Sequence, residues 1–197
     1  LRFFSRFLLL CFGVWPLING SFPNMGTYII MMNHSSFIDI LLFPLIPRGK
    51  WTGITAIENF NYPILQNILK LMHAIPINRS NKNDAINSIK KAEYALKDGM
   101  HIGIMPEGER STTGMLLPFK KGGFHMALNT RTPILPVGII GAFRFNPKNR
   151  FWIKPGFIKI NIGDPVALDK ENNCTVDQFS IIIENKIKLL SGELYEN

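Results

Sequence analysis

The stretch Asn33-His34-Ser35-Ser36-Phe37-Ile38-Asp39 decides the organisation of this chain, because it separates two apolar runs of different character. The run before it, residues 27–32, is rich in residues that favour β-structure and predicts a buried strand ending at Asn33. The run after it, residues 37–46, is long enough for a short helix, which Pro44 and Pro47 would close. The polar residues between the two runs therefore lie at a corner between a strand and a helix.

His34 is placed to act as a base at this corner. The unpaired N–H groups and positive dipole end of a helix start disfavour an imidazolium, and the neutral ring is the form that a general base needs. In one continuous helix, side chains five positions apart point about 140° away from each other, so Asp39 meets His34 only where the chain turns. Asp39 would then hold one ring nitrogen and fix the tautomer. A second interpretation stays open for Asp39, since Ser36 and Asp39 also match a capping box.

Composition limits the classes of partner. The 197 residues suit one domain, and 46% hydrophobic residues suffice for a core. Lys and Arg outnumber Asp and Glu by 22 to 14, which points to nucleic acid, an acidic membrane surface or a phosphorylated substrate. Fifteen Phe and a positive mean hydropathy of +0.10 favour the membrane. No interleaved aromatic and basic motif supports nucleic acid.

Cysteine and histidine spacing gives no support for a metal site. Cys11 and Cys174 are too few and too far apart for a disulfide framework or a zinc site, so a reducing compartment is the simpler expectation. The histidines form no pair at metal-ligand spacing; they are His34, His73, His101 and His125. Phosphate-binding and dinucleotide-binding glycine motifs and the Gly-x-Ser-x-Gly motif are absent from the sequence.

Residues 1–20 are expected to associate with a membrane, and residues 21–197 to form the main domain. A helix over 7–18 would be about 18 Å long, against a hydrocarbon core near 30 Å, so it cannot cross a bilayer alone. It is interpreted as an interfacial helix or as the end of a transmembrane span that begins upstream. A signal peptide and a buried core helix are the alternatives, and the aromatic bulk of Phe3, Phe4 and Trp15 favours the interface.

Strand and helix patterns alternate along the rest of the chain. This alternation predicts a single α/β domain with a largely parallel central sheet flanked by helices, and with antiparallel additions late in the chain. Further strands are predicted at 51–57, 74–77, 101–105 and 132–140, with a closing hairpin of 152–154 and 157–162. Helices are predicted at 61–71, 84–97, 119–127 and 176–190.

Three polar clusters follow successive predicted strands: His34 with Asp39, then Arg79, then residues 107–111. Ligands of open α/β sheets collect at the carboxyl ends of the strands, so these clusters are expected to share one cleft. Arg79 and Arg110 carry planar guanidinium groups suited to phosphate. The amides of residues 108–111 would add a small anion-binding nest.

In four blocks, the chain resembles the glycerolipid acyltransferases of the 1-acyl-glycerol-3-phosphate acyltransferase type. The blocks occur in the family's order and at compatible spacing, which makes the resemblance more specific than any single block. They are Asn33-His34-x4-Asp39, Ala74-Ile75-Pro76-Ile77-Asn78-Arg79, Met105-Pro106-Glu107-Gly108-Glu109-Arg110-Ser111 and Thr132-Pro133-Ile134-Leu135-Pro136-Val137.

This resemblance implies an O-acyltransferase that moves a fatty acyl group from acyl-CoA or acyl carrier protein to a lysophospholipid hydroxyl, giving phosphatidic acid. It implies His34 as general base, oriented by Asp39. The phosphate of the acceptor would be held by a set of residues in the second and third blocks, and two prolines of the fourth block would line the acyl side. The phosphate set is Arg79, Glu107, Gly108, Arg110 and Ser111, and the prolines are Pro133 and Pro136.

The same resemblance implies no metal and no prosthetic group, because the thioester itself supplies the activation. It implies a protein associated with the cytoplasmic face of an anionic membrane, with a lysophospholipid and a thioester donor as partners and no nucleic acid.

Two departures from the family pattern bear on the acceptor. Glu109 stands where Thr is usual, and Ala56-Ile57-Glu58 stands where many members have Lys-x-Glu. Lys120 or Lys121 is a candidate for the missing charge. The alternatives are therefore acylation of another lysophospholipid, of glycerol 3-phosphate or of a lipoamino acid, and, from another class, a non-catalytic membrane lipid-binding protein.

Overall fold

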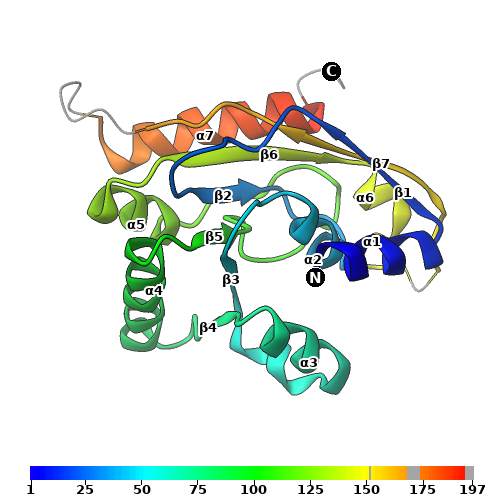
Figure 1. Ribbon diagram of the computed structural model, residues 1–197, viewed down its shortest axis with the longest axis horizontal. Coiled ribbons are helices and arrows are strands. Elements are labelled where there is room, and N and C mark those ends of the chain that lie inside the picture. The colour runs from blue at the N-terminus through cyan, green and yellow to red at the C-terminus, as the bar shows by residue number, and fades with distance from the viewer. Residues whose placement is uncertain (151, 168–173, 194–197) are drawn as a thin grey trace.

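The computed structural model describes residues 1–150, 152–167 and 174–193. Its centre is one seven-stranded sheet with the order β1-β7-β6-β2-β5-β3-β4 (Figure 1). The strands are β1 Val14–Asn19, β2 Ile29–Met32, β3 Trp51–Ala56, β4 Ile75–Ile77, β5 His101–Ile104, β6 Ile134–Ile140 and β7 Gly156–Ile162.

The five strands from β2 to β6 are mutually parallel, as the alternating pattern predicted. β7 pairs antiparallel with β6 and parallel with the edge strand β1, so β1 and β7 run against the other five. The predicted hairpin of 152–154 with 157–162 is wrong, because β7 takes its second partner from the start of the chain. The Gly156 N–H donates to the carbonyl of Gly13 at 2.9 Å, which begins this pairing.

Helices cover both faces of the sheet. They are α1 Arg2–Cys11, α2 Asp39–Leu42, α3 Pro63–Leu71, α4 Lys82–Lys97, α5 Gly122–Thr130, α6 Ala142–Phe145 and α7 Val176–Ser191, with 3₁₀ turns at Phe43–Leu45 and Ile57–Asn61. Caps explain two of the starts. Asn81 accepts hydrogen bonds from the first-turn amides of α4, and Thr175 with Gln178 forms a capping box on α7.

The alternation of side chains along β2 divides the core into two clusters. Ile30 and Met32 pack with α1 and α2 on one face, whereas Ile29 and Met31 pack with α4, α5 and α7 on the other. All four are completely buried, which explains why the sequence of β2 is a continuous apolar run.

The amino terminus differs from its prediction. The expected helix over 7–18 is wrong, because α1 ends at Cys11, Gly13 turns the chain with φ of 71°, and β1 follows. Pro16 is tolerated there because β1 is an edge strand. On α1, Leu9 is buried against the sheet while Phe3 is 92% exposed. Within the described ranges, no helix combines the length and hydropathy needed to cross a bilayer.

Candidate active site

Residues 33–39 follow the carboxyl end of β2 and lead into α2, which begins at Asp39. Because β2, β4 and β5 are parallel, the segments that follow these strands meet at the same edge of the sheet. The structure therefore brings together the three polar clusters: His34 with Asp39 after β2, Arg79 after β4, and residues 107–111 after β5.

His34 and Asp39 form a direct pair. Nδ1 of His34 lies 2.8 Å from Oδ2 of Asp39, and the Asp39 side chain is completely buried. The same Oδ2 accepts the backbone N–H groups of Ser35 and Ser36, each at 2.9 Å. The capping-box interpretation is half right, since the carboxylate does reach back to Ser36. The Ser36 hydroxyl does not cap α2 and instead donates to the carbonyl of Asn146 at 3.0 Å.

This arrangement fixes the tautomer of His34. A carboxylate oxygen that already accepts two amides can only accept again, so Nδ1 carries the proton and Nε2 keeps its lone pair. The His34 side chain is 21% exposed and lines a cavity. Among the described residues, none makes a hydrogen bond to Nε2, so this atom is available to a ligand in the cavity.

Glu107 holds the backbone of His34. Its Oε1 accepts the His34 N–H at 2.6 Å, and its Oε2 accepts the Leu117 N–H at 3.0 Å. Burial raises the pKa of this carboxyl to about 7; the two amide bonds oppose the rise, and repulsion from Asp39 and Glu193 adds to it. Because both oxygens already bind the backbone, we reassign Glu107 from phosphate binding to positioning the loop.

Two further side chains fix the same loop. The Asn33 side chain exchanges hydrogen bonds with the backbone of Ile139, accepting its N–H at 2.7 Å and donating to its carbonyl at 3.0 Å. The Ser111 N–H donates to the His34 carbonyl at 2.8 Å. The Ser111 hydroxyl donates to the Met115 carbonyl at 2.6 Å, so Ser111 is also reassigned from the phosphate set to the loop. Sequence reasoning missed the role of Asn33, for which the signal is an amide directly after a buried strand.

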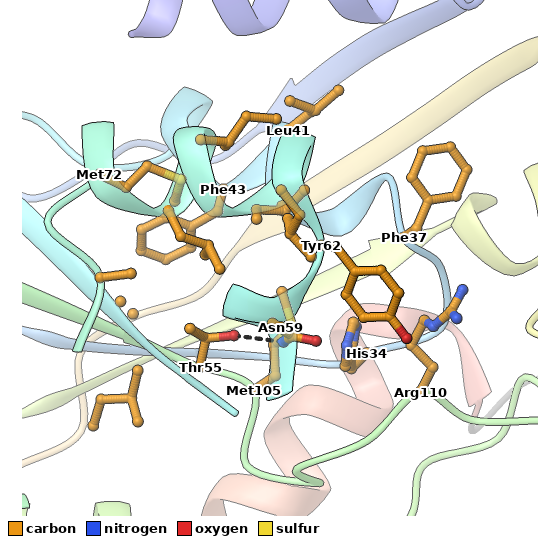
Figure 2. Close-up of a pocket in the computed structure, with 18 of the residues that line it drawn as sticks. His34, Phe37, Leu41, Phe43, Thr55, Asn59, Tyr62, Met72, Met105 and Arg110 are labelled. Carbon is orange, nitrogen blue, oxygen red and sulfur yellow. Dashed lines mark hydrogen bonds between the residues drawn. The ribbon is translucent and has the colours of Figure 1, made fainter. Parts of the chain in front are cut away.

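A cavity of about 710 Å³ begins beside His34. Most of its wall is apolar and comes from α2, α3, β3 and β5, with Leu8 and Phe12 contributed by α1 and the turn after it. Figure 2 shows His34, Tyr62 and Arg110 toward one side of the cavity and Phe43 and Met72 toward the other. The cavity is therefore polar near the histidine and apolar beyond it, which suits a ligand with a polar head and a long hydrocarbon chain.

The two predicted phosphate-binding arginines are close to the histidine loop. Arg110 lines the cavity together with His34, and Arg79 is exposed and donates to the carbonyl of Gly108. The predicted nest is smaller than expected, because the N–H groups of Gly108 and Ser111 already donate to backbone carbonyls. Arg79 and Arg110 are thus the cations that this edge of the sheet offers to an anion.

The structure shows the surroundings of Glu109, Lys120 and Lys121, the charged residues connected with the two departures from the family pattern. Glu109 is ion-paired with Lys148 at 3.3 Å, so its carboxylate is partly neutralised. Lys121 pairs with Asp177 at 2.6 Å, at the start of α7. Neither Lys120 nor Lys121 belongs to the described lining of the cavity, so neither replaces the missing lysine there.

Pro133 and Pro136 lie away from the cavity, outside its described lining. Pro133 precedes β6, and its carbonyl accepts the Ile29 N–H at the amino-terminal ends of the parallel strands, opposite to His34. Pro136 lies within β6, where its ring would contact a Cβ added at Gly163. The two prolines therefore do not line the described cavity, whose apolar wall is built by α2, α3, β3 and β5.

Comparison with known proteins identifies the family. The acyltransferase family model matches residues 18–140. The 1-acyl-sn-glycerol-3-phosphate acyltransferase of Cocos nucifera is 39% identical over 84% of this chain, and that of Limnanthes douglasii is 34% identical over 94%. The chain spans 54% and 64% of the lengths of these two relatives.

Among solved structures, the 1-acyl-sn-glycerophosphate (LPA) acyltransferase PlsC from Thermotoga maritima superposes with a TM-score of 0.84 at 25% identity. The match covers all of this chain and 78% of that one. Fold similarity and sequence similarity agree. The chain therefore belongs to the acyltransferase family, and the relatives named above that it resembles are 1-acyl-sn-glycerol-3-phosphate acyltransferases.

Proposed function

We propose that this protein transfers a fatty acyl group from a thioester, acyl-CoA or acyl carrier protein, to the free hydroxyl of 1-acyl-glycerol-3-phosphate, giving phosphatidic acid. One observation carries the proposal: the Nδ1 atom of His34 is held 2.8 Å from Asp39 beside an apolar cavity that Arg110 also lines. The names of the relatives support lysophosphatidic acid as the acceptor.

His34 acts as the general base in this reaction. Its Nε2 takes the proton of the acceptor hydroxyl as that oxygen attacks the thioester carbonyl. Asp39 stabilises the imidazolium that forms and keeps the ring in its orientation. When the tetrahedral intermediate breaks its carbon–sulfur bond, the imidazolium returns the proton to the departing thiolate. The products are the ester and a free thiol, and no metal or prosthetic group is required.

The two ends of the cavity suit the two ends of a lipid. The apolar wall beyond His34 accommodates a fatty chain, and Arg110 with Arg79 binds the phosphate, because guanidinium groups pair with phosphate oxygens through two parallel hydrogen bonds. The ordering of chain, hydroxyl and phosphate along one cavity places the reacting oxygen beside Nε2.

The protein works on an anionic membrane, and α1 attaches it there. The outward side of α1 carries exposed aromatic side chains, with Phe3 at 92% and Phe7 at 63% exposure, and its charged residues are Arg2 and Arg6. The cytoplasmic face is proposed because Cys11 and Cys174 are free thiols, which suits a reducing compartment.

The direct test is thiol release from palmitoyl-CoA by detergent-solubilised protein with lysophosphatidic acid, glycerol 3-phosphate or lysophosphatidylcholine as acceptor. We expect release that depends on lysophosphatidic acid and is lost in His34→Ala. His125→Ala is the matched control, since His125 is an exposed histidine on α5. Thiol release with another acceptor would overturn the assignment of substrate. Vesicle binding without thiol release, from palmitoyl-CoA or from acyl carrier protein, would favour a non-catalytic lipid-binding protein.

The occupant of the cavity is tested with a graded series at Gly53. Gly53 lines the cavity, and a Cβ added there meets its nearest neighbour, the Gly103 carbonyl, at an ordinary 3.6 Å. Substitution by Ala, Val and Leu should shorten the acyl chain preferred in lysophosphatidic acid in that order, measured by competition between lysophosphatidic acids of different chain length. A preference that stays constant along the series would place the acyl chain elsewhere.

A further inference from the structure

A second apolar surface lies apart from the exposed side of α1, at the same end of the sheet as His34. We call it the rim patch, and its apolar members come from the start of β1, the start of β7 and the loop before β7. They are Trp15, Trp152, Ile153 and Phe157. Their exposed fractions are 47%, 61%, 37% and 67%, so each presents much of its side chain to solvent.

Contacts between distant segments build this patch. The rings of Trp15 and Phe157 lie 5.8 Å apart between centroids, on neighbouring parallel strands that are paired in register. A Cβ added at Gly13 would lie only 2.8 Å from Pro155, so the turn after α1 touches the loop before β7. Figure 1 shows the end of α1 and the starts of β1 and β7 at one end of the molecule. The patch therefore joins the start of β1, the start of β7 and the loop before β7 at one end of the molecule.

The segments that carry these rings contain Lys and Arg residues and no acidic residue. Residues 141–162 contain five Lys or Arg and no Asp or Glu, and residues 1–38 contain no acidic residue either. Arg150 lies over the ring of Trp152, with its guanidinium carbon 5.9 Å from the centroid. Arg150, Lys154 and Lys159 are exposed, and within the described ranges none of the three forms an ion pair.

We propose that the rim patch is a second membrane contact, which inserts Trp152 and Phe157 into the interface of an anionic leaflet while Arg150, Lys154 and Lys159 bind lipid phosphates. Tryptophan rings and flanking basic side chains are the combination that suits the boundary between headgroups and hydrocarbon. A surface this basic repels a second copy of itself, which favours a lipid as its occupant.

Continuity with the cavity supports the lipid assignment. Phe12 lines the cavity beside His34, is 36% exposed and directly precedes Gly13, the residue that touches the loop before β7. Its ring also meets Phe37, another cavity residue, with centroids 6.2 Å apart. The cavity wall at Phe12 thus adjoins the turn that touches the loop before β7. The inference extends the proposed membrane attachment and rests on it, but it does not depend on the acceptor.

The test is sedimentation of the protein with vesicles of phosphatidylcholine, with and without phosphatidylglycerol. For the double variant Trp152→Ser/Phe157→Ser we expect about a tenfold lower partition coefficient on both vesicles, because two exposed aromatic side chains no longer insert. The matched control is Tyr94→Ser/Ile181→Ser, whose side chains are 67% and 57% exposed on α4 and α7. The control should bind as the wild type does.

A second set of variants separates binding to lipid phosphates from insertion of apolar side chains. The triple variant Arg150→Gln/Lys154→Gln/Lys159→Gln should lose at least tenfold on anionic vesicles and little on neutral ones. The corresponding control changes Lys82, Lys90 and Lys91, which are exposed on α4, to Gln. Equal losses in the test and control variants would overturn the proposal.

Two outcomes distinguish this inference from the proposed function. The rim variants should keep wild-type thiol release with detergent-dispersed substrate, because they leave the cavity intact. Vesicle binding that depends on the rim patch in a protein without transfer activity would sustain the inference while the proposed function fails. Unchanged vesicle binding together with loss of a dimer in light scattering would overturn the inference and assign the patch to a second copy of the chain.

Discussion

The two ends of the parallel sheet each hold a histidine, and the two residues differ in how many ring nitrogens are occupied. At the amino-terminal end, His101 accepts the Tyr28 N–H on Nδ1 at 3.1 Å and donates from Nε2 to the Arg48 carbonyl at 2.9 Å. At the carboxyl end, His34 binds Asp39 through Nδ1, and Nε2 has no hydrogen-bond partner among the described residues. Both ring nitrogens of His101 are therefore used in structural hydrogen bonds, whereas Nε2 of His34 is available to a ligand.

Burial separates the two histidines as well. His101 is 6% exposed and packs against the rings of Phe22 and Tyr28, whose centroids lie 4.9 Å and 5.9 Å from its own. Burial lowers its pKa and the bond to Arg48 opposes this, so the folded state favours the neutral ring. A histidine at the end of a strand can therefore act as a base only where one ring nitrogen has no hydrogen-bond partner in the protein and lies beside a cavity.

The largest effect is expected at the open nitrogen. His34→Ala should reduce acyl transfer by about a thousandfold, because the variant lacks the proposed general base, and should also lower the melting temperature, because the completely buried Asp39 loses its Nδ1–H donor. Initial rates and thermal melts measure the two effects. A variant that keeps most of its rate would remove the functional difference between the two histidines.

The next effect is expected at the residue that orients the ring. Asp39→Asn should lower the rate about a hundredfold, because an amide carries no negative charge to stabilise the imidazolium, and an NH₂ group in the place of the unpartnered Oδ1 would find no acceptor. Stability should also fall, since the site is completely buried. Rates measured well below the melting temperature separate the two effects. Retention of the rate with lowered stability would reduce Asp39 to a structural residue.

Glu107→Gln should lower the rate about tenfold, because only one of the two backbone amides keeps its acceptor. The pKa of Glu107 is raised above its unfolded value of 4.5 to about 7, so its contribution to stability is complete below pH 4.5 and is lost as pH rises through 7. The difference in melting temperature, wild type minus variant, should therefore shrink between pH 5 and pH 8. A difference that grows with pH would contradict the assignment.

The smallest effect on the rate is expected at His101. His101→Gln should leave transfer unchanged at low temperature and lower stability by about 1 to 2 kcal/mol, because one or both hydrogen bonds are lost. The pKa of His101 is lowered, so its contribution to stability is present above pH 6.5 and is lost as pH falls. The destabilisation by the substitution should thus be greatest above pH 6.5. A variant with normal stability and reduced transfer would invert the comparison.

The sequence predicted most of the fold because local patterns determined it. Strands with continuous apolar runs and helices with caps were found within a few residues, as for β2 and α4. The amino terminus failed for a physical reason. Residues 14–19 are apolar and follow a helix, and only their pairing with β7, more than a hundred residues later, makes them a strand.

The candidate site was predicted in part. The pairing of His34 with Asp39 follows from spacing and from the turn between strand and helix, and both are visible in the sequence. The roles of Glu107 and Ser111 were not visible, because each binds the backbone of His34, which parallel strand pairing brings close. Pro133 and Pro136 were expected on the acyl side and lie outside the described lining of the cavity, because no local pattern shows which loops enclose a cavity.

The most direct test of the account is the protonation of the two histidine rings, measured by long-range ¹H–¹⁵N correlation on uniformly labelled protein at neutral pH. We predict that His34 carries its proton on Nδ1, bound to Asp39, and that His101 carries its proton on Nε2. We also predict that lysophosphatidic acid perturbs only the His34 signals. A His34 ring protonated on Nε2, or one that does not respond to the lipid, would contradict the claim that this nitrogen is the base.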